Sequence, residues 1–494
     1  MFRFLYIVPI LFFLSCATSK APKEEFRGVW IATVANIDWP KSPDDPVKKK
    51  KEDFIEILDF YQKMNFNAAI VQVRTAGDAL YPTDLAPWSR YLTGKEGKAP
   101  TGFDEPLKWM IDETHKRGME FHAWLNPYRA TVNLDTTLLS KKHDYHQHPD
   151  WIIKYGKKYY YNPGLPEVRE KFKNIIEELV VNYELDAIHF DDYFYPYKVE
   201  GETFDDAKTY AKYGLPGQSL EDWRRSNVDS LVKDVHNTIK KHKPWVQFGI
   251  SPFGVWKNKS TDPKGSDTKA GQTTYEDLYA DPVLWVQQGW LDYLAPQVYW
   301  SMDYPVASHK IIAAWWANNT PNTNLYIGNG TYKIKNNADK AWEKKNEIPK
   351  QLNFVRDMEN INGNIFFSAK SLMGQHEKVN KMLRKKFYQL PAENPGPLNR
   401  KTRAIQLPAI KSVKQDNQVL EICIDHTDYI PRFLNLYISK KGKSQLIGKE
   451  YLSESKMEGC YQFHLTKKQL RSDIQINISD AFGNQSALQS LNLK

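Results

Sequence analysis

The sequence predicts a (β/α)8 barrel, or TIM barrel, followed by a small all-β sandwich. Strand-like and helix-like stretches alternate eight times between residues 26 and 387, as in a closed parallel barrel. A buried strand at residues 186–192 ends in two adjacent carboxylates, and barrel enzymes carry their chemistry at the C-terminal ends of strands. After residue 387, short strands separated by polar turns replace the alternation. A chain of 494 residues has room for both domains.

The expected barrel strands are short runs with apolar alternation, and amphipathic helical patterns separate them. The strands are expected at residues 27–34, 68–74, 120–126, 186–192, 246–252, 293–300, 325–332 and 363–371. Clear helical patterns occupy residues 48–64, 105–116, 166–183, 220–241 and 375–386. We therefore expect the barrel to span residues 26–387.

Alternation along the strands assigns their side chains to two faces. Apolar side chains should face outward, where helices cover them: Val71, Val73, Ala123, Leu125, Ile188, Phe190, Phe248, Ile250, Pro296 and Val298. The expected inward side chains are Gln72, Arg74, His122, Trp124, Asn126, His189, Asp191, Ser251, Gln297, Tyr299 and Ser368. Since a purely structural barrel would place Val, Ile and Leu inside, the polar and aromatic inward set predicts a pocket for a polar ligand.

The C-terminal region has a different composition. Residues 388–407 are Pro-rich and polar and are expected to form a linker. Residues 408–494 predict a β-sandwich of immunoglobulin or fibronectin type III architecture, acting as a spacer or glycan-facing module. Its Cys423 and Cys460 could form a disulfide in an exported protein. The linker leads us to expect that a barrel ending near Phe387 folds by itself.

The N-terminus predicts export and lipid anchoring. Arg3 precedes an apolar run at residues 4–14, which is too short to span a bilayer and is typical of a signal peptide. Leu14-Ser15-Cys16 resembles a bacterial lipobox, so residues 1–16 are expected to be a signal peptide and Cys16 to be acylated. The alternative is an ordinary secretory signal. We expect the protein in the bacterial cell envelope, anchored by lipid and facing the periplasm or the cell surface.

Charge and histidine content limit the partners. The net charge of +9 is spread over dispersed lysines, which is typical of a solvated basic surface or, alternatively, indicates mild attraction to an anionic polymer; no basic tract predicts nucleic-acid binding. The tract His143-Asp144-Tyr145-His146-Gln147-His148 lacks helical i, i+4 spacing and Cys partners, so we expect a solvated loop. A metal-dependent sugar deacetylase is the alternative. We expect no cofactor, no metal and a monomer.

Seven motifs between Phe26 and about Lys386 occur in the order found in the glycosyl-hydrolase-like family 10 proteins, which the chain resembles. They are Phe26-Arg27-Gly28-Val29-Trp30, Gln72-Val73-Arg74 with Gly77-Asp78-Ala79, His122-Ala123-Trp124-Leu125-Asn126-Pro127-Tyr128-Arg129, the stretch at 186–196, Gly249-Ile250-Ser251-Pro252-Phe253-Gly254-Val255-Trp256, Pro296-Gln297-Val298-Tyr299-Trp300 and Phe366-Phe367-Ser368. The resemblance implies a glycoside hydrolase barrel of bacterial envelope lipoproteins. Members have been connected with peptidoglycan glycan strands that have lost their stem peptides.

Glycoside hydrolysis usually needs two carboxyl groups about 5 to 9.5 Å apart. The catalytic candidates are Asp191 at the strand end, Asp192 next to it, and Asp78 in the loop after the second strand. A substrate-assisted reaction through an N-acetyl group is a further option. The expected substrate-binding residues are Arg74, His122, Trp124, Asn126, Tyr193, Gln297, Tyr299 and Trp300. We expect hydrolysis of an N-acetylhexosamine-containing glycan, namely peptide-free peptidoglycan; the alternative is a scaffold that binds glycan without cleaving it.

Overall fold

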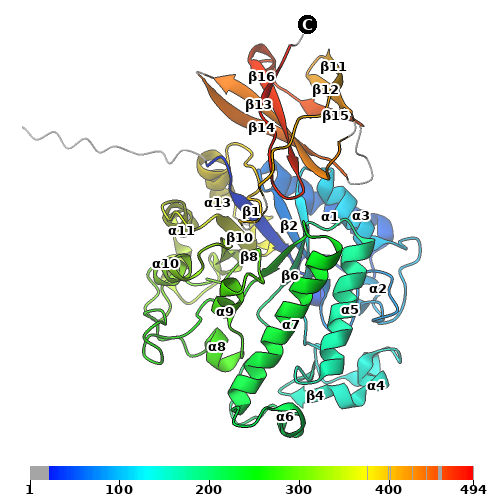
Figure 1. The fold of residues 1–494 in the computed structure, drawn as a ribbon, viewed down its shortest axis with the longest axis vertical. Helices are drawn as coiled ribbons and strands as arrows, with labels where there is room; N and C mark the ends of the chain where they lie inside the picture. Colours follow the sequence, from blue (N-terminus) through cyan, green and yellow to red (C-terminus); the bar gives the residue numbers. More distant parts are fainter. Residues whose placement is uncertain are drawn as a thin grey trace, which may run out of the picture.

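The structure is a computed structural model that describes residues 22–374, 376–398, 400, 402–425, 427–440, 442–453 and 459–492. The expected signal peptide at residues 1–16, with Cys16, lies outside the described residues. A barrel with its covering helices makes up most of the molecule, and a β-sandwich packs against one end of it (Figure 1).

Eight parallel strands close into a barrel in the order β1-β10-β9-β8-β7-β6-β3-β2, which confirms the predicted TIM barrel. They are β1 (Phe26–Ile31), β2 (Ala68–Arg74), β3 (Glu120–Leu125), β6 (Ala187–Phe190), β7 (Gln247–Ile250), β8 (Tyr293–Leu294), β9 (Asn324–Gly330) and β10 (Gly363–Phe367). The longer helices are α1 (Val47–Lys63), α3 (Pro106–His115), α5 (Pro166–Asn182), α7 (Leu220–His242), α10 (His309–Asn319) and α11 (Glu347–Arg356).

Shorter elements fill the connections. The helices among them are α2 (Arg90–Thr93), α4 (Asp144–Gln147), α6 (Ala207–Tyr213), α8 (Thr274–Asp277), α9 (Pro282–Gln287), α12 (Ala369–Leu372) and α13 (Glu377–Met382). A π-helix, η6 (Leu383–Phe387), continues α13. The connection from β3 to α5 also carries a hairpin, β4 (Ile152–Tyr155) and β5 (Lys158–Tyr161).

Several strands end before the expected residue, and two of them, β8 and β10, end well before it. The strand expected at 293–300 ends at Leu294, because Pro296 has no N–H to donate to the sheet. The segment beyond still follows the barrel, since Val298 N donates to Gly328 O over 3.0 Å. The strand expected to reach residue 371 ends at Phe367, because α12 begins two residues later, at Ala369. Both shortened ends lie at the rim of the barrel. The chain leaves the sheet there, and its side chains can face the space above the barrel.

The predicted alternation separates two cores. The outward side chains, such as Val71 and Ile188, are fully buried in the layer between strands and helices. The interior of the barrel has its own cluster, in which Phe26 stacks on Tyr326 with ring centroids 4.0 Å apart. This aromatic cluster fills the lower barrel, so an open pocket can form only above it, at the C-terminal ends of the strands.

The C-terminal domain consists of two antiparallel sheets, β11-β12-β15 and β14-β13-β16-β17, around an aliphatic core. The strands are β11 (Ile410–Asp416), β12 (Val419–Ile424), β13 (Pro431–Lys440), β14 (Lys443–Tyr451), β15 (Gly459–His464), β16 (Asp473–Asp480) and β17 (Gln489–Leu491). Cys423 and Cys460 face each other on β12 and β15 and form a disulfide. The all-β domain predicted from the sequence is thus present.

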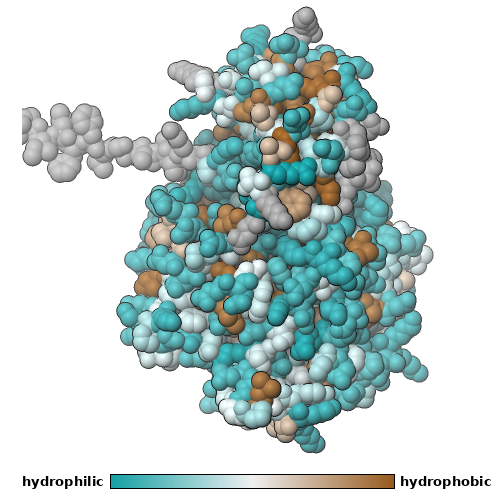
Figure 2. Space-filling model, viewed as in Figure 1, coloured by the Kyte–Doolittle hydropathy of each residue, from teal (hydrophilic) through white to brown (hydrophobic). Residues whose placement is uncertain are grey.

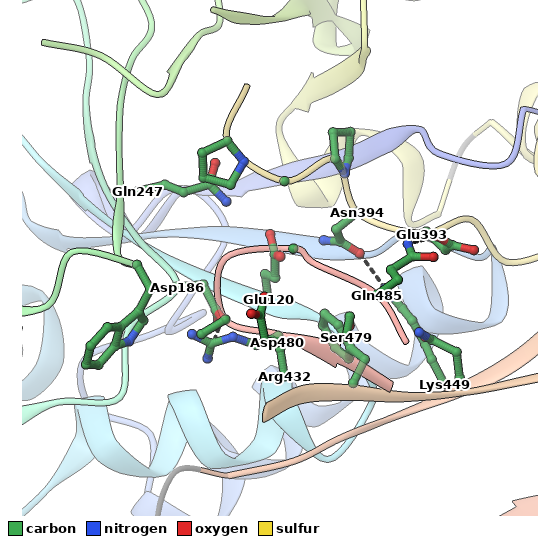
Figure 3. A pocket seen from close by; sticks show the side chains of 18 residues that line it. Glu120, Asp186, Gln247, Glu393, Asn394, Arg432, Lys449, Ser479, Asp480 and Gln485 are labelled. Atoms are coloured by element: carbon green, nitrogen blue, oxygen red, sulfur yellow. Dashed lines mark hydrogen bonds and ion pairs between the residues drawn. The ribbon is translucent and has the colours of Figure 1, made fainter. Parts of the chain in front are cut away.

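The Pro-rich segment that joins the two domains is packed against both. Arg27 Nη1 donates to Leu390 O over 2.7 Å, and Ala392 is buried. The Glu393 carboxylate accepts a hydrogen bond of 2.6 Å from the Tyr437 hydroxyl of the sandwich. Figure 3 shows the polar junction between the barrel base and the sandwich, with Asp186 and other charged side chains at its centre. The segment is therefore a fixed connection rather than a solvated tether.

The surface facing the viewer in Figure 2 is mostly hydrophilic, with apolar residues scattered in small groups. Among the described residues, we find no helix with the length and apolar character needed to cross a membrane.

Candidate active site

A pocket of about 400 Å³ opens at the C-terminal ends of the barrel strands. Its lining comes from nearly every side of the barrel, including Trp30 on β1, Gln72 on β2 and Trp124 on β3. The other lining residues are Ala32, Val34, Ile37, Arg129, Asp191, Asp192, Tyr193, Tyr197, Ser251, Phe253, Gln297, Tyr299, Trp300, Tyr332, Lys333 and Phe367. The pocket lies where a TIM barrel places its active site.

Strand β6 places the two aspartates in this pocket. Its alternation sends Phe190 outward and His189 inward, so Asp191 follows on the inward side. The His189 ring is fully buried below the pocket, where its Nε2 accepts from Trp30 Nε1 over 3.2 Å. The strand ends at Phe190, and Asp192 also lines the pocket. Both carboxyl groups thus come from consecutive residues at one strand end.

The Asp191 carboxylate is held by hydrogen bonds from both sides. The Asn126 side-chain amide donates to Oδ2, and the Tyr193 backbone N–H donates to Oδ1 over 3.3 Å. Asn126 is itself fixed, because Gln72 Nε2 donates to its Oδ1 over 2.7 Å. This chain orients the Asn126 amide so that its N–H, and not its oxygen, faces the carboxylate.

The Asp192 carboxylate has a different set of partners. The Tyr197 hydroxyl donates to its Oδ2, and the Gln297 side chain also acts as a hydrogen-bond partner. Gln297 is held in turn by donating to Ser251 O over 3.0 Å. The two carboxyl groups are therefore positioned independently, one from β3 and one from the loops after β6 and β8.

Burial controls the charge of this pair. It is the largest influence on both groups and raises the pKa of Asp191 to about 7, with the neighbouring Asp192 charge adding to the rise. Burial also raises the pKa of Asp192, against the hydrogen bonds from Tyr197 and Gln297. Two adjacent buried carboxylates do not both ionise readily, so the pair retains one proton near neutral pH. One acid and one base are then available together.

Arg129 is one of two cations that line the pocket, together with Lys333. Its guanidinium lies over the Tyr193 ring, 4.2 Å from the centroid. Its Nε has no hydrogen-bond partner among the described residues, and its charge lowers the pKa of both aspartates. An arginine with no carboxylate partner in a pocket is suited to bind an anionic group of a ligand.

Aromatic rings form the walls of the pocket. Tyr299 stacks on Phe367 with centroids 5.9 Å apart, and Trp300 meets the edge of Phe253 at 5.6 Å. Trp124 and Tyr193, both expected from the sequence, also line the pocket. Such rings offer flat apolar surfaces to the C–H faces of a sugar.

Four expected site residues do not line the pocket: Asp78, Arg74, His122 and Asn126. Asp78 caps its own loop, accepting from Thr75 N over 3.1 Å and Ala76 N over 2.9 Å. The expectation that Arg74 faces inward is wrong, because a bulge after Gln72 turns it outward over the Phe172 ring. His122 faces inward but lies deeper, where its Nδ1 bonds the Tyr293 hydroxyl over 2.9 Å.

The histidine tract at residues 143–148 was the alternative candidate for a metal site. His143 is buried and structural: its Nδ1 accepts from Tyr145 N over 3.0 Å at the start of α4, and its Nε2 bonds Ala130 O over 3.0 Å. Burial lowers the pKa of His143 to about 4. Asp144 pairs with Lys171 over 2.6 Å. The partners of these side chains lie in the same long connection and on α5.

Comparison with known proteins agrees with this geometry. The glycosyl hydrolase-like 10 family profile matches residues 25–344. The chain belongs to the glycosyl hydrolase-like 10 family. It is 47% identical over 396 residues to the glycosyl hydrolase YngK of Bacillus subtilis (strain 168), covering 79% of this chain and 77% of that protein. It is 41% identical over 374 residues to the glycosyl hydrolase DigH of Escherichia coli (strain K12), covering 71% of this chain and 84% of that protein.

Among solved structures, the PgaB (BpsB) glycoside hydrolase domain from Bordetella bronchiseptica is similar, with a TM-score of 0.48 and 11% identity, over 73% of this chain and 99% of that chain. The family membership confirms the resemblance seen in the motifs. The protein is a glycoside hydrolase, and the pocket carrying Asp191 and Asp192 is the candidate active site of this family member.

Several pocket residues were not anticipated as site residues. Arg129 stands in one of the family motifs, four residues beyond the end of β3. Tyr197 directly follows the motif at residues 186–196, and Lys333 and Tyr332 follow β9. All four lie beyond the strand ends, where alternation no longer reports direction; Tyr332 and Lys333 belong to the 3-10 helix η4 (Thr331–Lys333). The motif around Arg129 was the one signal that could have singled it out.

Proposed function

We propose that this family member cleaves N-acetylhexosamine-containing glycans, namely peptidoglycan strands without stem peptides, and that Asp191 and Asp192 are its catalytic carboxyl groups. They are the acids among the described residues that line the pocket. Their consecutive positions bring both to the same side of a bound sugar. A separate carboxylate nucleophile on the opposite wall is absent from the described lining residues, which supports a substrate-assisted reaction.

In this mechanism the protonated carboxyl group of the pair gives its proton to the glycosidic oxygen as the bond from C1 to that oxygen breaks. The carbonyl oxygen of the substrate's own 2-acetamido group bonds to C1, giving an oxazolinium ion. The ionised carboxylate accepts a hydrogen bond from the acetamido N–H and so orients the attacking oxygen. Water then attacks C1, its proton returns to the carboxylate that acted as acid, and the acetamido group is restored. Two displacements at C1 retain the anomeric configuration.

The observation that carries the substrate class is Arg129, which lines the pocket with the two acids and whose Nε has no hydrogen-bond partner among the described residues. N-acetylmuramic acid differs from N-acetylglucosamine by a lactyl ether, which adds a carboxylate. The Arg129 guanidinium, fixed over Tyr193, offers that carboxylate charge-assisted hydrogen bonds. From the sequence we expected Arg74 to bind the substrate, but that side chain is buried and does not line the pocket.

The test compares peptide-free peptidoglycan oligosaccharides with chitin oligosaccharides of equal length. We expect the parent enzyme to prefer the muramic acid substrate in kcat/KM. Arg129→Met should reduce that preference by about 10- to 100-fold, the worth of charge-assisted hydrogen bonds, and Arg129→Lys should restore part of it. Equal loss on both substrates would mean that Arg129 serves only the aspartates. A parent that binds glycan but cleaves none would support the scaffold alternative.

A further inference from the structure

A cluster of exposed cations lies on the side of the barrel, on α1, α13 and η6. We call it the basic face; it consists of Lys63, Lys378, Lys381, Arg384, Lys385 and Lys386. All six side chains are exposed, and none forms an ion pair with another described residue. Four of the six line one surface groove, where Glu377 is the single acid among the described lining residues. The basic face therefore carries a large excess of positive charge.

The positive surface continues beyond this groove. Lys378 lines a neighbouring groove together with Lys335, Lys344 and Lys345, and two acids, Glu343 and Glu377, line it as well. Cations that outnumber the acids among them repel one another, and these side chains extend into solvent. The arrangement complements a broad surface of negative charge better than a single small anion.

The basic face lies beside the point where the chain enters the barrel. Arg356 Nη2 donates to the Glu25 carboxylate and to Phe387 O, each over 2.8 Å. The start of β1 is thus fixed next to the end of η6. Only a handful of residues separate residue 22 from Cys16, the expected lipid site, and they reach about 20 Å when fully extended. A lipid at Cys16 would bring the membrane within reach of the basic face.

We propose that the basic face docks on the anionic headgroups of the membrane to which the chain is anchored. Each Lys or Arg held near such a surface adds to the attraction, which falls off within a Debye length. The start of β1 is at the base of the barrel, whereas the active-site pocket opens at the C-terminal ends of the strands. Docking by the basic face therefore leaves the pocket mouth free for a polymer.

The test uses a chain without the expected lipid site and measures how strongly the basic face alone binds a membrane. A chain beginning at residue 22 keeps every element of the described fold, and its binding to vesicles is measured by co-sedimentation. The probe is phosphatidylglycerol mixed with phosphatidylcholine, against pure phosphatidylcholine. The variant combines Lys381→Glu, Arg384→Glu and Lys385→Glu. The matched control combines Lys157→Glu, Lys198→Glu and Lys208→Glu, three exposed lysines near the β4–β5 hairpin and α6, far from α13 in Figure 1.

We expect the parent to bind the anionic vesicles at low salt, to release them at about 0.5 M salt, and to ignore the neutral ones. The basic-face variant should bind at least about tenfold more weakly, and the control variant within about twofold of the parent. Equal binding to neutral vesicles, no binding by the parent, or equal losses in both variants would overturn the proposal.

Discussion

The Arg432 guanidinium of the sandwich lies 3.0 Å from the Asp186 carboxylate, at the start of the strand that carries Asp191 at its other end. The Asp186 carboxylate also bonds His115 Nε2 over 2.8 Å and accepts from Phe121 N over 2.7 Å. Burial opposes its charged form, but the Arg432 and His115 charges outweigh burial and lower the pKa of Asp186 to about 2. The sandwich thus neutralises a buried charge of the barrel.

Replacing Arg432 with Ala should destabilise the protein by about 3 kcal/mol, because it leaves the buried Asp186 charge without its strongest partner. Lys411→Ala is the matched control in the same domain, since its pair with Asp425 is half exposed and worth about 0.5 kcal/mol. Urea unfolding measures the stability of both variants.

The stability that Asp186 contributes depends on pH. Its pKa is lowered in the folded protein, so this contribution is present above pH about 4 and is lost as pH falls towards 2. A deficit of the Arg432 variant that is no larger than that of the control would contradict this role.

Truncation after Phe387 should yield a poorly soluble or unstable barrel, contrary to the expectation from the Pro-rich sequence. The cut removes Arg432 from Asp186 and exposes the surface that Leu390 and Ala392 cover. Expression of the truncated and complete chains, followed by thermal unfolding, measures the difference. A truncated barrel as stable as the complete protein would restore the view of two independent domains.

Tyr197→Phe should lower kcat about tenfold and move the acid limb of the kcat–pH profile to higher pH. The hydroxyl's hydrogen bond lowers the pKa of Asp192, so its removal lets that pKa rise. Tyr195→Phe is the control in the same loop, because the Tyr195 hydroxyl is buried and does not bond either carboxylate. A profile of Tyr197→Phe that coincides with that of the control would remove Tyr197 from the site.

Asp191→Asn should raise the melting temperature by a few degrees at pH 8 and by less at pH 5. The pKa of Asp191 is raised from 3.8 to about 7, so folding favours its protonated form. The stability it contributes is complete below pH about 4 and is lost as pH rises through about 7. The Asn side-chain amide does not ionise, so the variant does not lose stability as pH rises through about 7. The exposed Asp205→Asn variant is the control. A melting temperature difference between Asp191→Asn and the parent that does not change with pH would argue against a buried, partly protonated Asp191.

The strand interiors of the barrel could be predicted well because period-two alternation is a local property. It assigned Ile188 outward and Trp124 inward, as the structure has them. Arg74 was misplaced because a bulge adds one residue between Gln72 and Arg74 and reverses direction. Composition alone does not mark such a bulge.

The loop residues of the site could not be predicted in the same way. Asp78 has a suitable carboxyl group, but that group accepts hydrogen bonds from the backbone N–H groups of Thr75 and Ala76 in its own turn. It is therefore held away from the pocket. Arg129 and Tyr197 reach the pocket through the folding of long connections, which no periodicity describes. The packing of the Pro-rich segment was equally hidden, since Leu390 and Glu393 are held by distant residues of two domains.

The most direct test of the account is the rate at which Asp191→Asn and Asp192→Asn release products from peptide-free peptidoglycan, followed by mass spectrometry. Each variant should remain folded and lose at least about 100-fold in rate relative to the parent, because each lacks one of the two carboxyl groups that transfer the proton and orient the acetamido group. Near-parental rates from both folded variants would contradict the assignment and place the catalytic groups elsewhere in the protein.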